Sequence, residues 1–250
     1  MQHIWISAAA LCAASFIGSL CGFFIKKMPH RWNDTIMGYC AGVMLAASVV
    51  GLILPAFEMT TDWDVLWVIG GVLAGAIFLN FLDYITPHMH HLTGLAPEEH
   101  QKNATLNRVM LFVMAIAIHK FPEGMAAGVG FNAEDVGNAW AVTAGLSLQN
   151  VPEGMVVISP LLLAGVSKGR TLMISLLIAV FEIVGVWVGF LAGHVSQQML
   201  PAMLAFAGGA MLYVVSDEMI PETHAHGYHK PATYALLIGF LSLVLMEGMF

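Results

Sequence analysis

The sequence is poor in charged residues. Only 10% of its 250 residues are Asp, Glu, Lys or Arg, whereas 58% are hydrophobic and the mean hydropathy is +0.79. A typical soluble domain is about one-quarter charged, so this chain has too few polar side chains to cover a soluble surface. The composition therefore indicates an integral membrane protein whose partner is the lipid bilayer.

Basic residues, cysteines and common catalytic motifs are also scarce. Nine Lys and Arg against sixteen Asp and Glu leave a net charge of −7, without the basic patch that nucleic acid requires. The three cysteines, Cys12, Cys21 and Cys40, lie in or beside apolar segments and suggest neither a disulfide framework nor a CxxC metal site. The sequence has no HExxH and no GxSxG motif, which leaves a zincin-type protease and a serine hydrolase without support.

Long apolar runs recur along the chain, and each is long enough to cross a bilayer, which takes about 20 residues. They are continuous rather than alternating, which argues against barrel strands and for an all-α integral membrane protein. The N-terminal run lacks a small-residue cleavage site, so we expect a retained first helix. The sequence predicts one domain over 1–250, a His-bearing loop over 86–107, and eight transmembrane helices at 3–25, 35–57, 63–85, 108–131, 137–165, 171–192, 198–220 and 231–249.

The distribution of basic residues predicts the orientation. Eight of the nine fall in the loops after spans 1, 3, 5 and 7, and the loops after spans 2, 4 and 6 have none. The positive-inside rule places the basic loops in the cytoplasm, so both termini are predicted on the outer side. The ninth basic residue, Lys120, lies inside the fourth span.

Two short segments repeat at a constant offset of thirty residues. HKFPEGM at 119–125 and QNVPEGM at 149–155 share Pro, Glu, Gly and Met. Because the fourth and fifth spans run in opposite directions, this repeat predicts a pseudo-twofold axis in the membrane plane, a pattern of secondary transporters. A weaker similarity relates GVMLAASVVGLILPAFE in the second span to GAMLYVVSDEMIPETH in the seventh.

Four charged residues lie well inside the predicted spans, namely Lys120, Glu123, Glu153 and Glu182. Each charge at membrane depth costs about 2.5–3.5 kcal/mol on insertion scales. We therefore expect these groups to face one another or water and to mark the path of an ion or substrate.

Each repeated motif places a carboxylate one helical turn from a nitrogen or oxygen donor. His119 and Glu123 are four residues apart, as are Gln149 and Glu153, so each pair shares a helix face. This donor set suits a divalent cation such as Zn²⁺, Fe²⁺, Co²⁺ or Mn²⁺. The alternatives are a hydrogen-bonded packing histidine and a simple proline kink.

HKFPEG and QNVPEG resemble the paired metal-binding motifs of the ZIP (Zrt/Irt-like) metal transporters, and the compact chain is similar to the bacterial GufA-like branch. The resemblance covers essentially all 250 residues. It implies a ZIP-type fold with an inverted 3+2+3 repeat and an elevator-type transporter, not an enzyme, in a bacterial inner membrane. It also implies that Zn²⁺, or Fe²⁺, Mn²⁺, Co²⁺ or Cd²⁺, moves into the cytoplasm as substrate without a cofactor, and that a homodimer is a candidate assembly.

The resemblance also implies roles for the positions that match the family's motifs. Five of them would form the transport site: His119, Glu123, Gln149, Glu153 and Met44. A second, adjacent metal position matches Lys120, Asn150 and Glu182. An acidic entrance residue matches Glu58, and ligands at the cytoplasmic exit match Asp83, His88 and Glu218.

Lys120 departs from the family, in which many sequences have Asn at this position. A protonated lysine has three donors and no lone pair, so it does not ligate a metal. Three buried glutamates balance one divalent ion plus the ammonium, whereas a second ion would leave excess positive charge at membrane depth. We hypothesise that Lys120 replaces the second metal; the alternative is that its side chain snorkels to an interface.

Two other functions use the same residues. A membrane-embedded zinc-dependent hydrolase would use a glutamate as base, with Ser147 as the nearby hydroxyl. A metal-independent proton-relay transporter would use the carboxylates alone.

Overall fold

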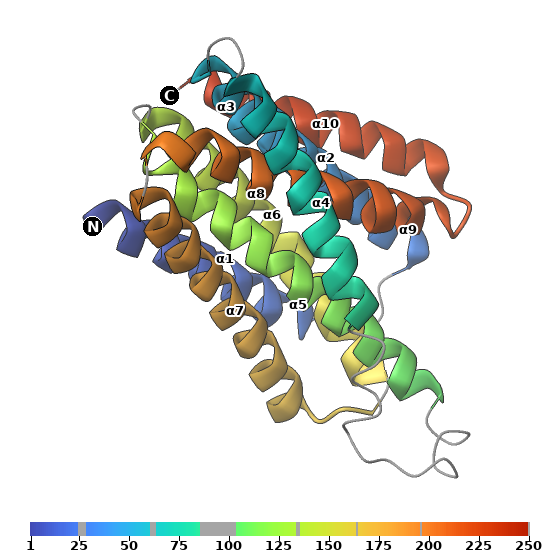
Figure 1. Ribbon diagram of the computed structural model, residues 1–250. Coiled ribbons are helices and arrows are strands. Elements are labelled where there is room, and N and C mark those ends of the chain that lie inside the picture. Colours follow the sequence, from blue (N-terminus) through green and yellow to red (C-terminus); the bar gives the residue numbers. More distant parts are fainter. Residues whose placement is uncertain are drawn as a thin grey trace.

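The computed structural model describes residues 1–24, 29–60, 64–85, 104–133, 136–163, 165–195 and 197–249, and every regular element within them is helical (Figure 1). The α-helices are α1 (Gln2–Gly22), α2 (His30–Ser48), α3 (Leu54–Glu58), α4 (Val65–Ile85), α5 (Ala104–Gly130), α6 (Val136–Leu163), α7 (Lys168–Val195), α8 (Leu200–Val214), α9 (Ile220–His224) and α10 (His229–Glu247). Two π-helical segments, η1 (Val49–Ile53) and η5 (Val215–Met219), and a 3₁₀ turn, η4 (Gln197–Met199), complete the set.

Six helical segments of the described chain are long and apolar enough to cross a membrane: Gln2–Gly22, His30–Glu58, Val65–Leu82, Lys168–His194, Leu200–His224 and His229–Glu247. They coincide with six of the predicted spans. The helices α5 and α6 coincide with the other two, but they are not among the six, and they carry seven of the sixteen buried polar or charged residues in the described part of the chain. Several helices begin or end a few residues beyond the predicted spans, because hydropathy marks the apolar part of a helix and not its polar ends.

The two π-helical segments, η1 and η5, lie in similar local sequences of elements, each between a long helix and a short one. Each is followed by a short helix with proline at its second residue, Pro55 after η1 and Pro221 after η5. Proline has no N–H, so Pro55 leaves the carbonyl of Gly51 without its usual helical partner. That carbonyl instead accepts a hydrogen bond from Asn138 Nδ2 of α6 at 3.1 Å. The segments η1 and η5 lie within the two weakly similar sequences of the second and seventh predicted spans.

The most extensive contacts divide the long helices into two groups. In the first group, α5 packs on α7, and α1 packs on α6 and α7. In the second group, α2 packs on α10, and α4 packs on α8. Figure 1 shows α7 and α10 at opposite edges of the molecule, with α5, α6 and α8 between them.

Glycines bring the backbones of each pair into direct contact. A Cβ on Gly128 would lie 2.0 Å from the carbonyl oxygen of Val186, and one on Gly185 would lie 2.3 Å from that of Phe121, so α5 and α7 touch backbone to backbone. Small residues serve this purpose in membrane helix pairs generally. The α1–α6, α2–α10 and α4–α8 pairs make the same kind of contact at Gly18, Gly42 and Gly75.

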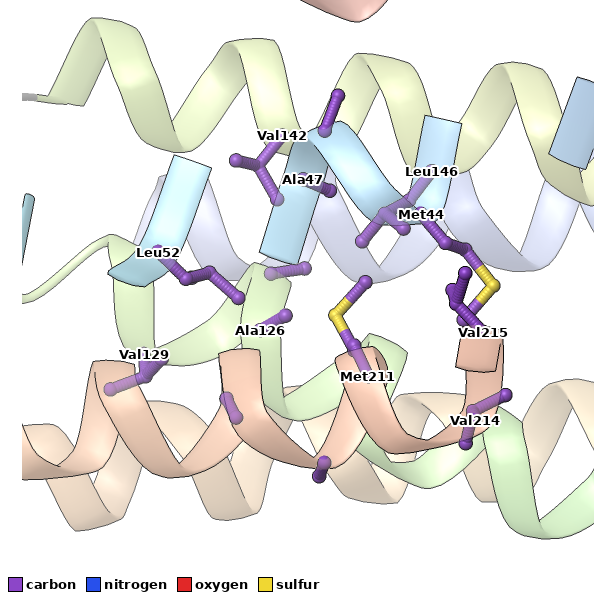
Figure 2. Close-up of a cluster of buried hydrophobic side chains, with 14 of the residues drawn as sticks. Met44, Ala47, Leu52, Ala126, Val129, Val142, Leu146, Met211, Val214 and Val215 are labelled. Carbon is purple, nitrogen blue, oxygen red and sulfur yellow. The ribbon is translucent and has the colours of Figure 1, made fainter. Parts of the chain in front are cut away.

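Side chains make the contact between the two groups. A Cβ on Gly51 would meet the Cγ2 atom of Val142, and one on Gly145 would meet the Cδ1 atom of Leu243. Figure 2 shows apolar side chains meeting here from α2, η1, α5, α6, α8 and η5: Met44, Ala47, Leu52, Ala126, Val129, Val142, Leu146, Met211, Val214 and Val215. The interface between the groups is thus largely apolar, unlike the backbone contacts inside each group.

We predict that Gly128→Ala weakens the α5–α7 contact. The added methyl group overlaps the Val186 carbonyl, and overpacking of this kind destabilises by about 1–3 kcal/mol. The melting temperature of the purified protein in detergent should fall by several degrees. The matched control is Gly70→Ala in α4, where an added Cβ meets nothing within 4 Å; equal melting temperatures for the two variants would contradict the prediction.

Candidate metal centre

Seven buried polar side chains gather where α5, α6 and α7 meet. Each is at most 5% exposed: His119, Lys120, Glu123, Gln149, Asn150, Glu153 and Glu182. The repeated motifs supply the first six from α5 and α6, and both helices continue through the prolines of these motifs. The seventh, Glu182, comes from α7, which the glycine contacts hold against α5.

The Lys120 ammonium lies among the acidic and amide side chains. Its Nζ atom donates hydrogen bonds to Glu123 Oε2 at 2.5 Å, to Asn150 Oδ1 at 2.5 Å and to Glu153 Oε2 at 2.6 Å. These three bonds use all the donors of a lysine. The Lys120 side chain is only 3% exposed and points into the cluster, so it does not snorkel to an interface.

Asn150 connects this ion-pair group to Glu182. Its Nδ2 atom donates to Glu182 Oε1 at 2.7 Å, and the hydroxyl of Ser15 in α1 donates to Glu182 Oε2 at 3.2 Å. The carboxylate of Glu182 is therefore satisfied by neutral donors, and Lys120 acts on it through Asn150. The sequence analysis did not single out Ser15, because a serine in an apolar helix carries no distinguishing pattern.

Two of the predicted ligand atoms have no hydrogen-bond partner within the described part of the chain. Gln149 donates through Nε2 to Glu123 Oε1 at 3.0 Å, but its buried Oε1 accepts nothing. His119 Nε2 lies 2.9 Å from Glu218 Oε2, yet the angles do not form a hydrogen bond. The Gln149 oxygen thus remains available beside the carboxylates, and the His119 nitrogen lies next to a carboxylate oxygen of Glu218. These are donor types that a divalent transition metal binds.

The acidic and histidine side chains of the cluster are not gathered around a single point. No group of three or more His, Cys, Asp or Glu side chains in the described ranges is gathered closely enough to hold a metal. The ammonium of Lys120 joins Glu123 to Glu153 instead. Metal binding here requires these two carboxylates to share their oxygens between Lys120 and the ion.

A small cavity adjoins the cluster on the α1 side. It measures about 20 Å³ and is lined by Lys120 and Glu153 together with Ser15, Ser19 and Ser175. About 10–15 Å³ is enough for one water molecule. The cavity therefore has room for a water molecule at the ion-pair group.

The other predicted residues lie in different surroundings. Met44 is fully buried in the apolar interface of Figure 2, and Glu58 is exposed at the end of α3. Glu218 lies in η5 and contacts His119, so it adjoins the central cluster. The side chain of Asp83 and the whole of His88 lie outside the described residues, so the predicted exit group stays a prediction.

Cys40 is a neighbour of the cluster that the sequence analysis set aside. Its thiol is buried in α2 and donates to the carbonyl oxygen of Gln149 at 3.8 Å, across the interface between the two helix groups. Its spacing could have identified it, because Cys40 lies one turn before Met44 on the same face of the helix.

Comparison with known proteins identifies relatives over most of the chain. A family model described as "ZIP Zinc transporter" matches residues 90–247. The zinc transporter GufA of Myxococcus xanthus is 38% identical over 239 residues, which cover 93% of each chain. The zinc transporter ZIPB of Bordetella bronchiseptica is 34% identical over 258 residues, which cover 97% of this chain and 79% of its own. The zinc transporter ZupT of Chlorobium phaeovibrioides is 34% identical over 249 residues, which cover 92% of each chain.

We predict that Lys120→Met strongly destabilises the fold. Without the ammonium, the buried carboxylates of Glu123 and Glu153 lose their shared partner, and breaking a buried pair costs about 3–5 kcal/mol. The melting temperature should fall in Lys120→Met. It should recover in part in the double variant Lys120→Met, Glu153→Gln, because one of the two unpaired buried carboxylates is then removed. The control is Lys230→Met at an exposed position; a melting temperature of Lys120→Met equal to that of the control would refute this role of the ion pair.

Proposed function

Because this chain belongs to the ZIP zinc transporter family, we propose that it carries Zn²⁺ across a bacterial inner membrane into the cytoplasm through the cluster on α5, α6 and α7. Family membership makes it a multi-pass membrane transporter for zinc rather than an enzyme, with zinc as its substrate. The observation that carries the proposed site is the unpartnered oxygen of Gln149, buried beside His119 and the carboxylates of Glu123 and Glu153.

In the proposed site, Zn²⁺ is held by His119, Gln149, Glu123 and Glu153. The nitrogen and oxygen donors match the ligands that zinc takes in proteins. Met44 would approach from α2, because it shares a helix face with Cys40, which touches the Gln149 backbone. Its side chain packs in the apolar interface between the two helix groups.

We further propose that the site holds one metal ion at a time. Glu123, Glu153 and Glu182 contribute three negative charges, and one divalent ion plus Lys120 contributes three positive ones. The hydrogen bonds of Lys120 to Glu123, Asn150 and Glu153 support this balance, since the ammonium already takes oxygens that a second metal would need. A second ion would leave two uncompensated positive charges at membrane depth.

Movement of the first helix group against the second would give elevator-type alternating access. The backbone contacts at glycines join helices within each group and resist sliding. The interface between the groups is largely apolar and built mostly from side chains, which can exchange neighbours at little cost. The polar contacts that cross it, from Cys40 to Gln149, from Asn138 to Gly51 and from His119 to Glu218, would break and reform during the movement. The cluster belongs to the first group, α1, α5, α6 and α7, so it would move with that group.

The paired π-helical segments support eight spans arranged as an inverted repeat. The repeated motifs relate α5 to α6, and the π-helix followed by proline relates α2 with α3 to α8 with α9. Inverted repeats place substrate sites near the bilayer midplane. In this proposal α5 and α6 are the two remaining spans, and both termini face outward.

The ion would enter past the exposed Glu58 and leave through Glu218 toward Asp83 and His88. The contact of Glu218 with His119 supports this order, because it places one exit carboxylate within reach of a central ligand. The family assignment disfavours a hydrolase. A proton relay without metal would retain transport when His119→Ala and Gln149→Ala are combined, whereas the proposed site would lose it.

We predict that Glu153→Ala abolishes zinc uptake into proteoliposomes. The variant removes a carboxylate that the proposed site uses both for the ion and for Lys120. Uptake should be measured with a panel of Zn²⁺, Fe²⁺, Mn²⁺, Co²⁺ and Cd²⁺. The matched control is Glu222→Ala, an exposed glutamate of α9, which should transport like wild type; undiminished zinc uptake by Glu153→Ala would exclude the proposed site.

Lys120→Asn should bind one more divalent ion in the centre than wild type does. The amide removes the fixed positive charge and supplies an oxygen donor. Equilibrium dialysis with metal analysis would count the bound ions, using Lys230→Asn as control. If the wild type binds two tight ions in the centre, or if Lys120→Asn binds no additional ion, the hypothesis that Lys120 occupies the second metal position is excluded.

A further inference from the structure

A second cluster of histidine and carboxylate side chains lies on the other helix group. It joins the first turns of α2, through His30 and Asp34, to His226 in the turn between α9 and α10 (Figure 1). None of the residues of the central cluster belongs to it. The three residues are distant in sequence, so the fold alone brings them together.

Asp34 is the buried member of this cluster. Its side chain is 0% exposed, and its Oδ1 atom lies 3.0 Å from His226 Nδ1. The other oxygen, Oδ2, has no hydrogen-bond partner in the described part of the chain. A buried polar atom left without a partner costs about 1–3 kcal/mol, so the Asp34 carboxylate is one that a further ligand would stabilise.

The two histidines are placed to supply nitrogen donors to the same ligand. The imidazole ring of His30 stacks on that of His226, with centroids 4.3 Å apart and an angle of 24° between the planes. His30 lies one helical turn before Asp34 on α2, so the two share a face of the helix. Both histidines are exposed, so their rings can turn without disturbing a packed core.

We propose that His30, Asp34 and His226 form a binding site for a divalent transition metal, for which Zn²⁺ is the best match, separate from the central site. Two tetrahedral zinc ligands at about 2.0–2.1 Å from the metal are about 3.3 Å apart. The 3.0 Å between Asp34 Oδ1 and His226 Nδ1 therefore needs to open by only a few tenths of an ångström to admit the ion in place of the bridging proton.

His30 completes the site when its ring turns out of the stack. In the stacked arrangement the three side chains do not form a gathered three-ligand group. Three protein ligands and one water molecule give zinc its usual four positions. The flanking loops are predicted to be cytoplasmic, so the site would face ions that have crossed the membrane. Metal binding here does not depend on the transport proposal.

The test compares zinc stoichiometry of purified full-length variants in detergent, by equilibrium dialysis at fixed free Zn²⁺. Compared with wild type, the double variant His30→Ala, His226→Ala should bind one equivalent less. Both positions are exposed, so the variant should fold. The matched control is His229→Ala, a nearby exposed histidine that stacks on His224 outside the trio, and it should bind as wild type does.

Glu153→Ala separates this site from the central one. That variant should keep the equivalent that depends on His30 and His226, whatever its transport activity. Asp34→Asn should lose the same equivalent as the double histidine variant. If the double variant binds as much zinc as His229→Ala, the trio is only a hydrogen-bonded clamp between α2 and the α9–α10 turn, and the proposal is overturned.

Discussion

Burial of charge beneath an apolar surface is the constraint on which the rest of this structure depends. Each uncompensated charge at membrane depth costs several kcal/mol, and the chain buries Glu123, Glu153, Glu182 and Lys120 together. The ammonium gives a hydrogen bond to each of two carboxylates and reaches the third through Asn150. These hydrogen bonds join the four charged side chains into one network, in which three acidic residues surround one basic residue.

That constraint explains why the helices around the cluster pack so closely. A polar network is stable in an apolar medium only when its hydrogen bonds have good geometry. The glycine contacts between α5 and α7 and between α1 and α6 bring Glu182 and Ser15 within hydrogen-bonding distance of their partners. The opposite surface of this group is largely apolar and meets α2 and α8 mostly through side chains. Close packing around the charges and a largely apolar surface beyond them both support the proposed movement of this helix group.

Much of the fold could be predicted from residue patterns. Long apolar runs located the helices to within a few residues, because a segment that crosses lipid must be apolar along its length. The offset of thirty residues between the two motifs identified α5 and α6 as the helices that carry the cluster. The polar ends of α2 and α7 were missed because hydropathy does not register them. The role of Cys40 was missed because one cysteine in an apolar run resembles a packing residue.

The sequence by itself determined the class of the protein, the helices and the identity of the charged residues in the central cluster, since composition and spacing are local properties of the chain. Only the tertiary structure decided which way those residues face. In the folded chain the Lys120 side chain points into the acidic cluster, and Glu218 contacts His119. The fold also brings His30 and Asp34 next to His226. These contacts unite residues from different helices, and their geometry follows from how closely backbones pack. A linear pattern does not encode that packing.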